Sequence, residues 1–153
     1  IYMKKIVFFL FALLMTFASC EGPMGPEGPA GPGTNWKILT FTVDSRDWKI
    51  MQNEDGSNPR FFYEFEVPEI DEFIYTDGLV SAYLYTNVGI ETQTPLPYVL
   101  HQEAVDNQGN PVFWTETYTY DYSPGSIAFY STFSDFFVEQ NPPTMEFRVA
   151  LMW

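Results

Sequence analysis

Apolar and polar residues alternate with a period of two in this chain, and this feature most constrains its fold. The alternation is clearest at residues 60–67, 112–122 and 145–153. Successive side chains of a strand point to opposite faces of a sheet, so the pattern is typical of strands with one buried face. From Trp36 onward no stretch sustains a helical period. The sequence therefore predicts an all-β domain.

Each of the three segments separates into faces. The first places Phe61, Tyr63, Phe65 and Val67 together; the second places Val112, Trp114, Tyr118, Tyr120 and Tyr122 opposite Thr115, Thr117, Thr119 and Asp121; the third places Met145, Phe147, Val149, Leu151 and Trp153 together. We expect these apolar faces, the tyrosine ladder included, to form the core. Because Trp153 ends the last apolar face, we also expect it to be packed in.

Less regular strands are predicted at residues 36–43, 48–52, 79–86, 97–103 and 126–133. Turn residues separate them at Asp55-Gly56, residues 106–110 and Ser123-Pro124-Gly125. One helical turn is predicted at residues 68–73, with Pro68 at its first position. About eight strands in residues 36–153 predict a single antiparallel β-sandwich, Ig-like or jelly-roll-like, with a small β-barrel as the alternative.

The residues before this domain have the pattern of an export signal. Met3, the better candidate for the start, precedes Lys4 and Lys5, and residues 6–17 are apolar but too short to span a bilayer. Phe17-Ala18-Ser19-Cys20 resembles a lipobox, where a signal peptidase cuts before a lipid-modified cysteine. We therefore expect a signal peptide at residues 1–19, with Phe17, Ala18 and Ser19 as its recognition residues. Cys20 would carry the lipid.

Residues 20–35 form a linker rich in glycine and proline. Gly22, Gly25, Gly28 and Gly31 recur at the threefold spacing of collagen. One interpretation is a polyproline II spacer of roughly 37 Å. The other is a collagen-like trimer, although four triplets are too few to order three chains without help. We favour the spacer, and hence a monomer over a trimer.

Composition limits the partners. Lys4 and Lys5 are two of the 7 basic residues and all 20 acidic residues follow Cys20, so a product beginning at Cys20 has a net charge of −15. Such a surface repels phosphate, which argues against a nucleic-acid partner. Cys20 is the only cysteine, so no disulfide can form within the chain.

The order of these parts resembles a known group. A lipobox, a Gly-Pro-X stub, Asn35-Trp36-Lys37, Trp48, Phe62-Tyr63-Glu64-Phe65 and a terminal strand at residues 145–153 are together similar to the small collagen-stub lipoproteins of gut Bacteroidetes. The resemblance implies an outer-membrane location but no activity or catalytic residue. Glu21 fits export to the cell surface, but Gly22-Pro23 follows it. Whether the protein faces outward or inward therefore stays open.

Few residues carry chemistry. His101, the only histidine, and the strand neighbours Glu64 and Glu66 are interpreted as structural or solvated, and no catalytic residue is assigned. Glu54 and Asp55 are a weak calcium candidate in a polar turn, and no metal or other cofactor is assigned. Trp48, beside a turn, and Trp36 are the candidate aromatic platforms for stacking a ligand.

These observations favour a non-enzymatic module that binds or interacts at the cell envelope, anchored by Cys20 on a short stalk. The alternatives are a carbohydrate-binding accessory lipoprotein of a glycan-uptake system and a structural, trimeric envelope component. The expected partners are the membrane, through lipid, and other envelope proteins or a glycan.

Overall fold

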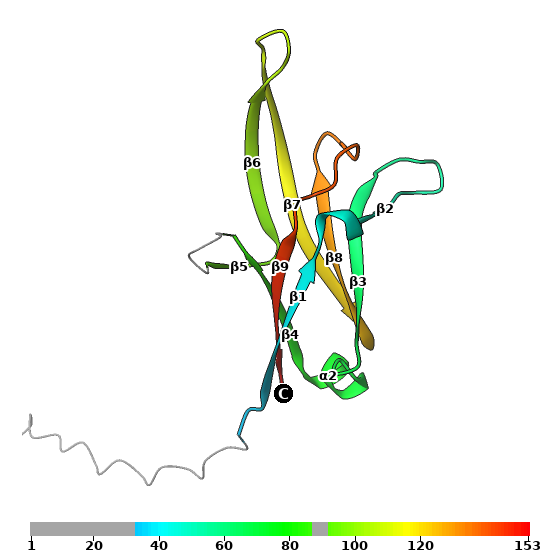
Figure 1. Ribbon diagram of the computed structural model, residues 1–153. Helices are drawn as coiled ribbons and strands as arrows, with labels where there is room; N and C mark the ends of the chain where they lie inside the picture. Colours follow the sequence, from blue (N-terminus) through cyan, green and yellow to red (C-terminus); the bar gives the residue numbers. More distant parts are fainter. Residues whose placement is uncertain (1–32, 87–91) are drawn as a thin grey trace, which may run out of the picture. The chain divides into compact units, whose positions relative to one another are not determined.

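The structure is a computed structural model that describes residues 33–86 and 92–153. Its elements belong to one compact unit, residues 34–153. In chain order they are β1 (Trp36–Val43), the 3-10 turn η1 (Ser45–Asp47), β2 (Lys49–Met51), β3 (Arg60–Val67), α2 (Glu72–Asp77), β4 (Leu79–Tyr85), β5 (Gln93–Pro95), β6 (Tyr98–Val105), β7 (Pro111–Ser123), β8 (Gly125–Phe133) and β9 (Met145–Met152) (Figure 1).

The strands form two antiparallel sheets, which confirms the predicted β-sandwich over the barrel. One sheet has the order β1-β9-β4-β5 and the other the order β2-β3-β8-β7-β6. The predicted bounds of β1 and β3 are correct, and most others shift by one or two residues. The described residues contain nine strands, one more than expected, because β5 is a three-residue strand that pairs with β4.

Aromatic side chains from both sheets meet in the core. Phe129 of β8 stacks on Phe147 of β9 with ring centroids 4.0 Å apart, and neither side chain is exposed. The inward faces predicted for β3 and β9 are confirmed, since Phe61, Val67 and Leu151 are also buried. Burial of these large apolar side chains is the main force that holds the two sheets together.

Two local predictions are wrong. The helix begins at Glu72 rather than at Pro68, because the Asp71 carboxylate accepts a hydrogen bond from the amide of Ile74 at 2.8 Å and so caps the first turn. Trp153 is 39% exposed, although Leu151 before it is buried. The chain end is held by its backbone, which exchanges two hydrogen bonds with Asn35.

The β6–β7 hairpin extends beyond the strands around it (Figure 1). β7 is 13 residues long, and a turn at residues 106–110 joins it to β6. The Asp106 carboxylate accepts hydrogen bonds from the amides of Gln108 and Asn110, and Gly109 has the positive φ that this tight turn needs. Residues 111–115 of β7 pair with β6 but lie beyond the register of β7 with β8, which begins at Glu116.

Candidate functional site

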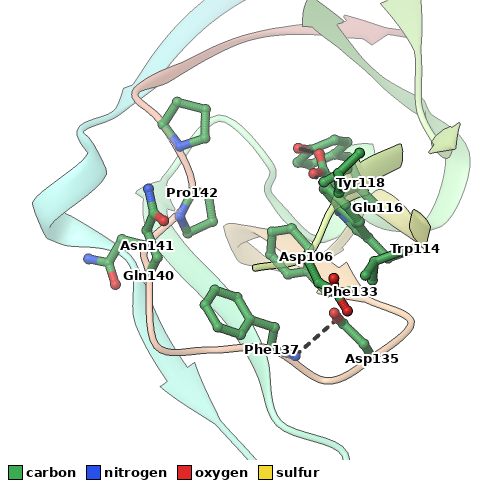
Figure 2. Close-up of a pocket in the computed structure, with 14 residues that line it drawn as sticks. Asp106, Trp114, Glu116, Tyr118, Phe133, Asp135, Phe137, Gln140, Asn141 and Pro142 are labelled. Atoms are coloured by element: carbon green, nitrogen blue, oxygen red, sulfur yellow. Dashed lines mark hydrogen bonds between the residues drawn. The ribbon is translucent and has the colours of Figure 1, made fainter. Parts of the chain in front are cut away.

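A hollow of about 480 Å³ lies between the β6–β7 hairpin and the loop of residues 134–144, which joins β8 to β9. Its volume is within the range of small-ligand sites, roughly 300–1,000 Å³. β7 contributes Trp114, Glu116 and Tyr118, and the loop contributes Asp135, Phe137 and Asn141. Figure 2 shows the three β7 residues together on one side of the view and Phe137, Gln140 and Asn141 of the loop on the other.

The three β7 residues form one row because they are two positions apart on a strand. The Trp114 indole N–H donates to Oε1 of Glu116 at 3.0 Å, and the Tyr118 hydroxyl donates to Oε2 at 2.7 Å. A carboxylate offers about four lone-pair sites. Each oxygen of Glu116 is therefore held in place and can still accept a hydrogen bond from a ligand.

Tyr118 is suited to hold this carboxylate. Burial, and next the hydrogen bond to Glu116, raise the pKa of the Tyr118 hydroxyl far above its ordinary value. The hydroxyl therefore stays protonated, and remains a donor to Glu116, throughout the physiological pH range.

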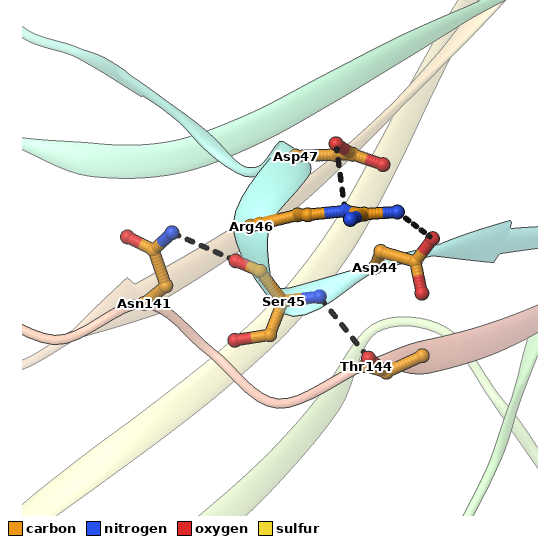
Figure 3. Close-up of polar contacts among 6 residues, drawn as sticks. All are labelled: Asp44, Ser45, Arg46, Asp47, Asn141 and Thr144. Carbon is orange, nitrogen blue, oxygen red and sulfur yellow. Dashed lines mark hydrogen bonds and ion pairs between the residues drawn. The ribbon is translucent and has the colours of Figure 1, made fainter.

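The loop wall is anchored at its far end to η1 (Figure 3). The Ser45 hydroxyl donates to the Pro142 carbonyl at 2.7 Å, and the Asn141 amide donates to the Ser45 carbonyl at 2.7 Å. The Ser45 amide also donates to the Thr144 hydroxyl at 3.1 Å. Residues nearly a hundred positions apart thus fix the part of the loop that includes Asn141.

The near end of the loop is anchored to β7. The Ser134 amide donates to the Thr115 carbonyl, and the Thr115 amide donates to the Ser134 hydroxyl, each at 2.9 Å. Within the loop the Phe137 amide donates to the Asp135 carboxylate at 3.2 Å, drawn in Figure 2. Both ends of this wall are therefore fixed by hydrogen bonds to the sandwich.

The hollow is acidic and aromatic. Asp106, Glu116 and Asp135 contribute carboxylates, Gln140 and Asn141 contribute amides, and the lining contains no Lys, Arg or His. An anion would meet only like charge there. Neutral ligands rich in hydroxyl groups, and cations, match the acceptors that the walls present.

The lining has no Ser, Cys or His, so the groups in it that could take part in catalysis are its carboxylates and the hydroxyl of Tyr118. Within residues 33–86 and 92–153 no group of three or more His, Cys, Asp or Glu side chains is placed to hold a metal ion. The arrangement is suited to holding a ligand by contact and hydrogen bonding.

The aromatic platforms predicted from the sequence lie elsewhere. Trp48 was expected to be exposed and is not: only 5% of it is accessible, its indole N–H donates to the Pro143 carbonyl at 3.3 Å, and its ring packs edge-on against Phe147. The turn before Trp48 directs it into the core rather than to solvent. Trp36 is 68% exposed but lies at the far end of β1, away from the hairpin (Figure 1).

Other candidates are placed outside the hollow. Asp55 accepts two hydrogen bonds from Ser57 in the β2–β3 turn, and these hydrogen bonds lower the pKa of its carboxyl. Glu54 is exposed beside it. The two residues stay a weak, untested calcium candidate. Glu64 and Glu66 are exposed on β3.

His101 is exposed on β6, and its Nδ1 lies 3.0 Å from the Thr115 hydroxyl. The tyrosine ladder is confirmed as core: Tyr118 is buried, and Tyr120 and Tyr122 are partly buried against the core. Tyr118 also reaches the hollow. The lipidation candidate Cys20 lies outside the described residues, as do Phe17, Ala18 and Ser19.

Sequence reasoning missed Glu116 and the loop wall. Glu116 interrupts the apolar face of β7 between Trp114 and Tyr118, and an acid at such a position is a signal that could have been read. The loop residues carry no periodic pattern, so their approach to β7 follows only from the tertiary structure.

No family model, curated protein or solved structure matches this chain. The fold and hollow therefore define its class on their own: an antiparallel β-sandwich with an acidic, aromatic hollow. In the described part of the chain, no helix has the length and apolar character needed to cross a membrane.

Proposed function

We propose that this protein is a non-enzymatic binding module of the bacterial cell envelope, anchored by lipid on Cys20, and that its ligand is a carbohydrate. The row of Trp114, Glu116 and Tyr118 carries the proposal for the ligand. The proposal for the anchor and for an outer-membrane location rests on the signal and lipobox pattern at residues 3–20.

A sugar ring has apolar C–H faces and an edge of hydroxyl groups. Trp114 and Phe137 supply aromatic surface for the face, and the carboxylates and amides of the hollow supply acceptors for the hydroxyls. The oxygens of Glu116 are oriented in advance, so a hydroxyl that bonds to them needs little further ordering. A hydrogen bond to a charged acceptor contributes about 1.5–3 kcal/mol.

A cationic ligand is the second candidate, favoured by the three carboxylates and the absence of basic residues in the lining. The two classes differ in their response to salt. Binding of a cation weakens as ionic strength rises, because screening reduces charge attraction, whereas binding of a neutral sugar changes little.

The test is a glycan array probed with the protein, followed by calorimetry with the strongest ligand at two salt concentrations. Trp114→Ala should weaken binding at least tenfold, and Trp36→Ala, which removes an exposed tryptophan away from the hollow, should leave binding unchanged. Silence on the array, or equal losses in both variants, would contradict a glycan site in the hollow.

A further inference from the structure

The two sheets end in four edge strands, and three of them have features that discourage pairing with another chain. β2 and β5 are three residues long, β5 contains Pro95, and β1 carries Lys37. Short strands, proline and lysine are common means of protecting a sheet edge. β6, residues 98–105, is eight residues long and contains neither lysine nor proline. Within the described residues it is the edge that lacks these protections.

The direction of the β6 backbone follows from its neighbours. The Ser134 amide donates to the Thr115 carbonyl, so the backbone of Thr115 faces β8. Successive residues of a strand alternate, so Trp114 and Glu116 direct their backbone groups to β6, where Gln102 and Leu100 are their partners. The even-numbered residues of β6 therefore bond to β7.

The odd-numbered residues of β6 consequently direct their N–H and C=O groups to the free edge. These residues are Val99, His101, Glu103 and Val105, and all four side chains are exposed. Val99 is 49% and Val105 69% exposed, so both valines are available for contact with another chain. Among residues 33–86 and 92–153, no strand pairs with this edge, and two of its four side chains, Val99 and Val105, are apolar.

We propose that β6 pairs antiparallel with β6 of a second copy of this chain, about a twofold axis beside Gln102, and so joins the two five-stranded sheets. In this register Val99 lies opposite the partner's Val105, and His101 lies opposite the partner's Glu103. An interface with twofold symmetry repeats each contact, so the valine pair and the His–Glu pair each form twice.

The sequence of β6 selects this register. Only registers that pair odd-numbered residues with each other bring the free backbone groups face to face. A shift of two positions one way places Glu103 opposite the partner's Glu103, and like charges directly opposite each other are destabilising. A shift of two positions the other way places His101 opposite the partner's His101 and Glu103 opposite the partner's Val99. The register centred on Gln102 pairs valine with valine and acid with imidazole.

The dimer has a consequence for the hollow. Ala104 of β6 lines the hollow, so the twofold axis brings two hollows to the same side of the joined sheet. If the proposed function holds, the dimer is bivalent toward a repetitive ligand, and linked sites gain avidity without a new contact. The pairing of β6 does not depend on that function.

Cysteine crosslinking tests the register. In this register Gln102 lies opposite the partner's Gln102, and no backbone hydrogen bond joins the two residues. The Cα atoms of such a pair are about 4.5 Å apart, which is within the disulfide range of about 4.4–6.8 Å. In the full chain carrying Cys20→Ala, Gln102→Cys should form a disulfide-linked dimer under mild oxidation. Leu100→Cys is the matched control, because its two copies would be roughly 14 Å apart.

Sedimentation velocity tests the association itself. The wild-type chain should sediment as a dimer, and Val99→Asp should raise the dimer dissociation constant at least tenfold. Leu79→Asp adds the same charge to a residue of similar exposure, 54%, on the other sheet, and should leave the dimer intact. A monomeric wild type, or equal crosslinking of the Gln102→Cys and Leu100→Cys chains, would overturn the proposal.

Discussion

The contact between Phe129 and Phe147 joins the two sheets, so removing one of its rings tests the packing of the sandwich. Phe147 is fully buried; its ring lies parallel to that of Phe129, with an interplanar angle of 13°, and receives the edge of Trp48 with centroids 6.5 Å apart. Phe147→Ala would leave a cavity between the sheets that neither neighbour can fill without moving the backbone.

The expected loss in the free energy of unfolding is large relative to the total stability of the domain. Phe→Ala in a core costs about 3–5 kcal/mol, and two aromatic contacts place Phe147 in the upper half of that range. Total stability of a domain is only about 5–15 kcal/mol. For a domain of this size the loss corresponds to a fall in melting temperature of roughly 10–20 °C.

Urea denaturation followed by circular dichroism measures this loss directly. Phe73→Ala is the control, because Phe73 is 54% exposed and its removal should change the free energy of unfolding by no more than about 0.5 kcal/mol. A loss below about 1.5 kcal/mol for Phe147→Ala, or one no larger than that of the control, would refute the packing described here.

Three further changes have defined outcomes. Gly78→Ala should destabilise the fold by about 1–3 kcal/mol, because a Cβ there would lie 2.7 Å from the Ile74 carbonyl oxygen, whereas Gly33→Ala, with open space around it, should be neutral in thermal melts. Burial and then the hydrogen bond to Asp121 raise the pKa of Tyr130 to about 12. The folded state thus favours the protonated phenol, and this contribution to stability, complete below the ordinary value of 10.0, is lost as pH rises through about 12. Tyr130→Phe should reduce that alkaline loss and remove one late-titrating tyrosinate from the ultraviolet titration. Cys20→Ala should abolish labelling of the protein by an alkyne fatty acid in cells; persistent label would contradict lipidation at Cys20.

The inward faces of β3 and β9 could be predicted because every second residue is apolar and a one-residue shift would expose all of them. The helix was misplaced because two start signals compete, Pro68 and Asp71, and only the carboxylate that reaches the amide of Ile74 decides between them. β5 was missed because three residues are too few to show a period.

The candidate site was less predictable than the fold. Trp48 lies near a turn in sequence, but its burial depends on Pro143 and Phe147, which are nearly a hundred residues away. Glu116 was visible as an acid within an apolar face, yet its role depends on a loop that approaches from beyond β8. Nonlocal contacts of this kind leave no periodic trace in the sequence.

The most direct test of the proposed function is calorimetric titration of Glu116→Gln and Glu66→Gln with the glycan that gives the strongest array signal. Glu66 is an exposed carboxylate on β3, away from the hollow. Losing a charged acceptor costs about 1.5–3 kcal/mol, so Glu116→Gln should weaken binding by roughly 10- to 150-fold, and Glu66→Gln should leave it unchanged. If the affinity of Glu116→Gln changes less than twofold while circular dichroism shows an intact fold, the result would contradict a glycan site at Glu116.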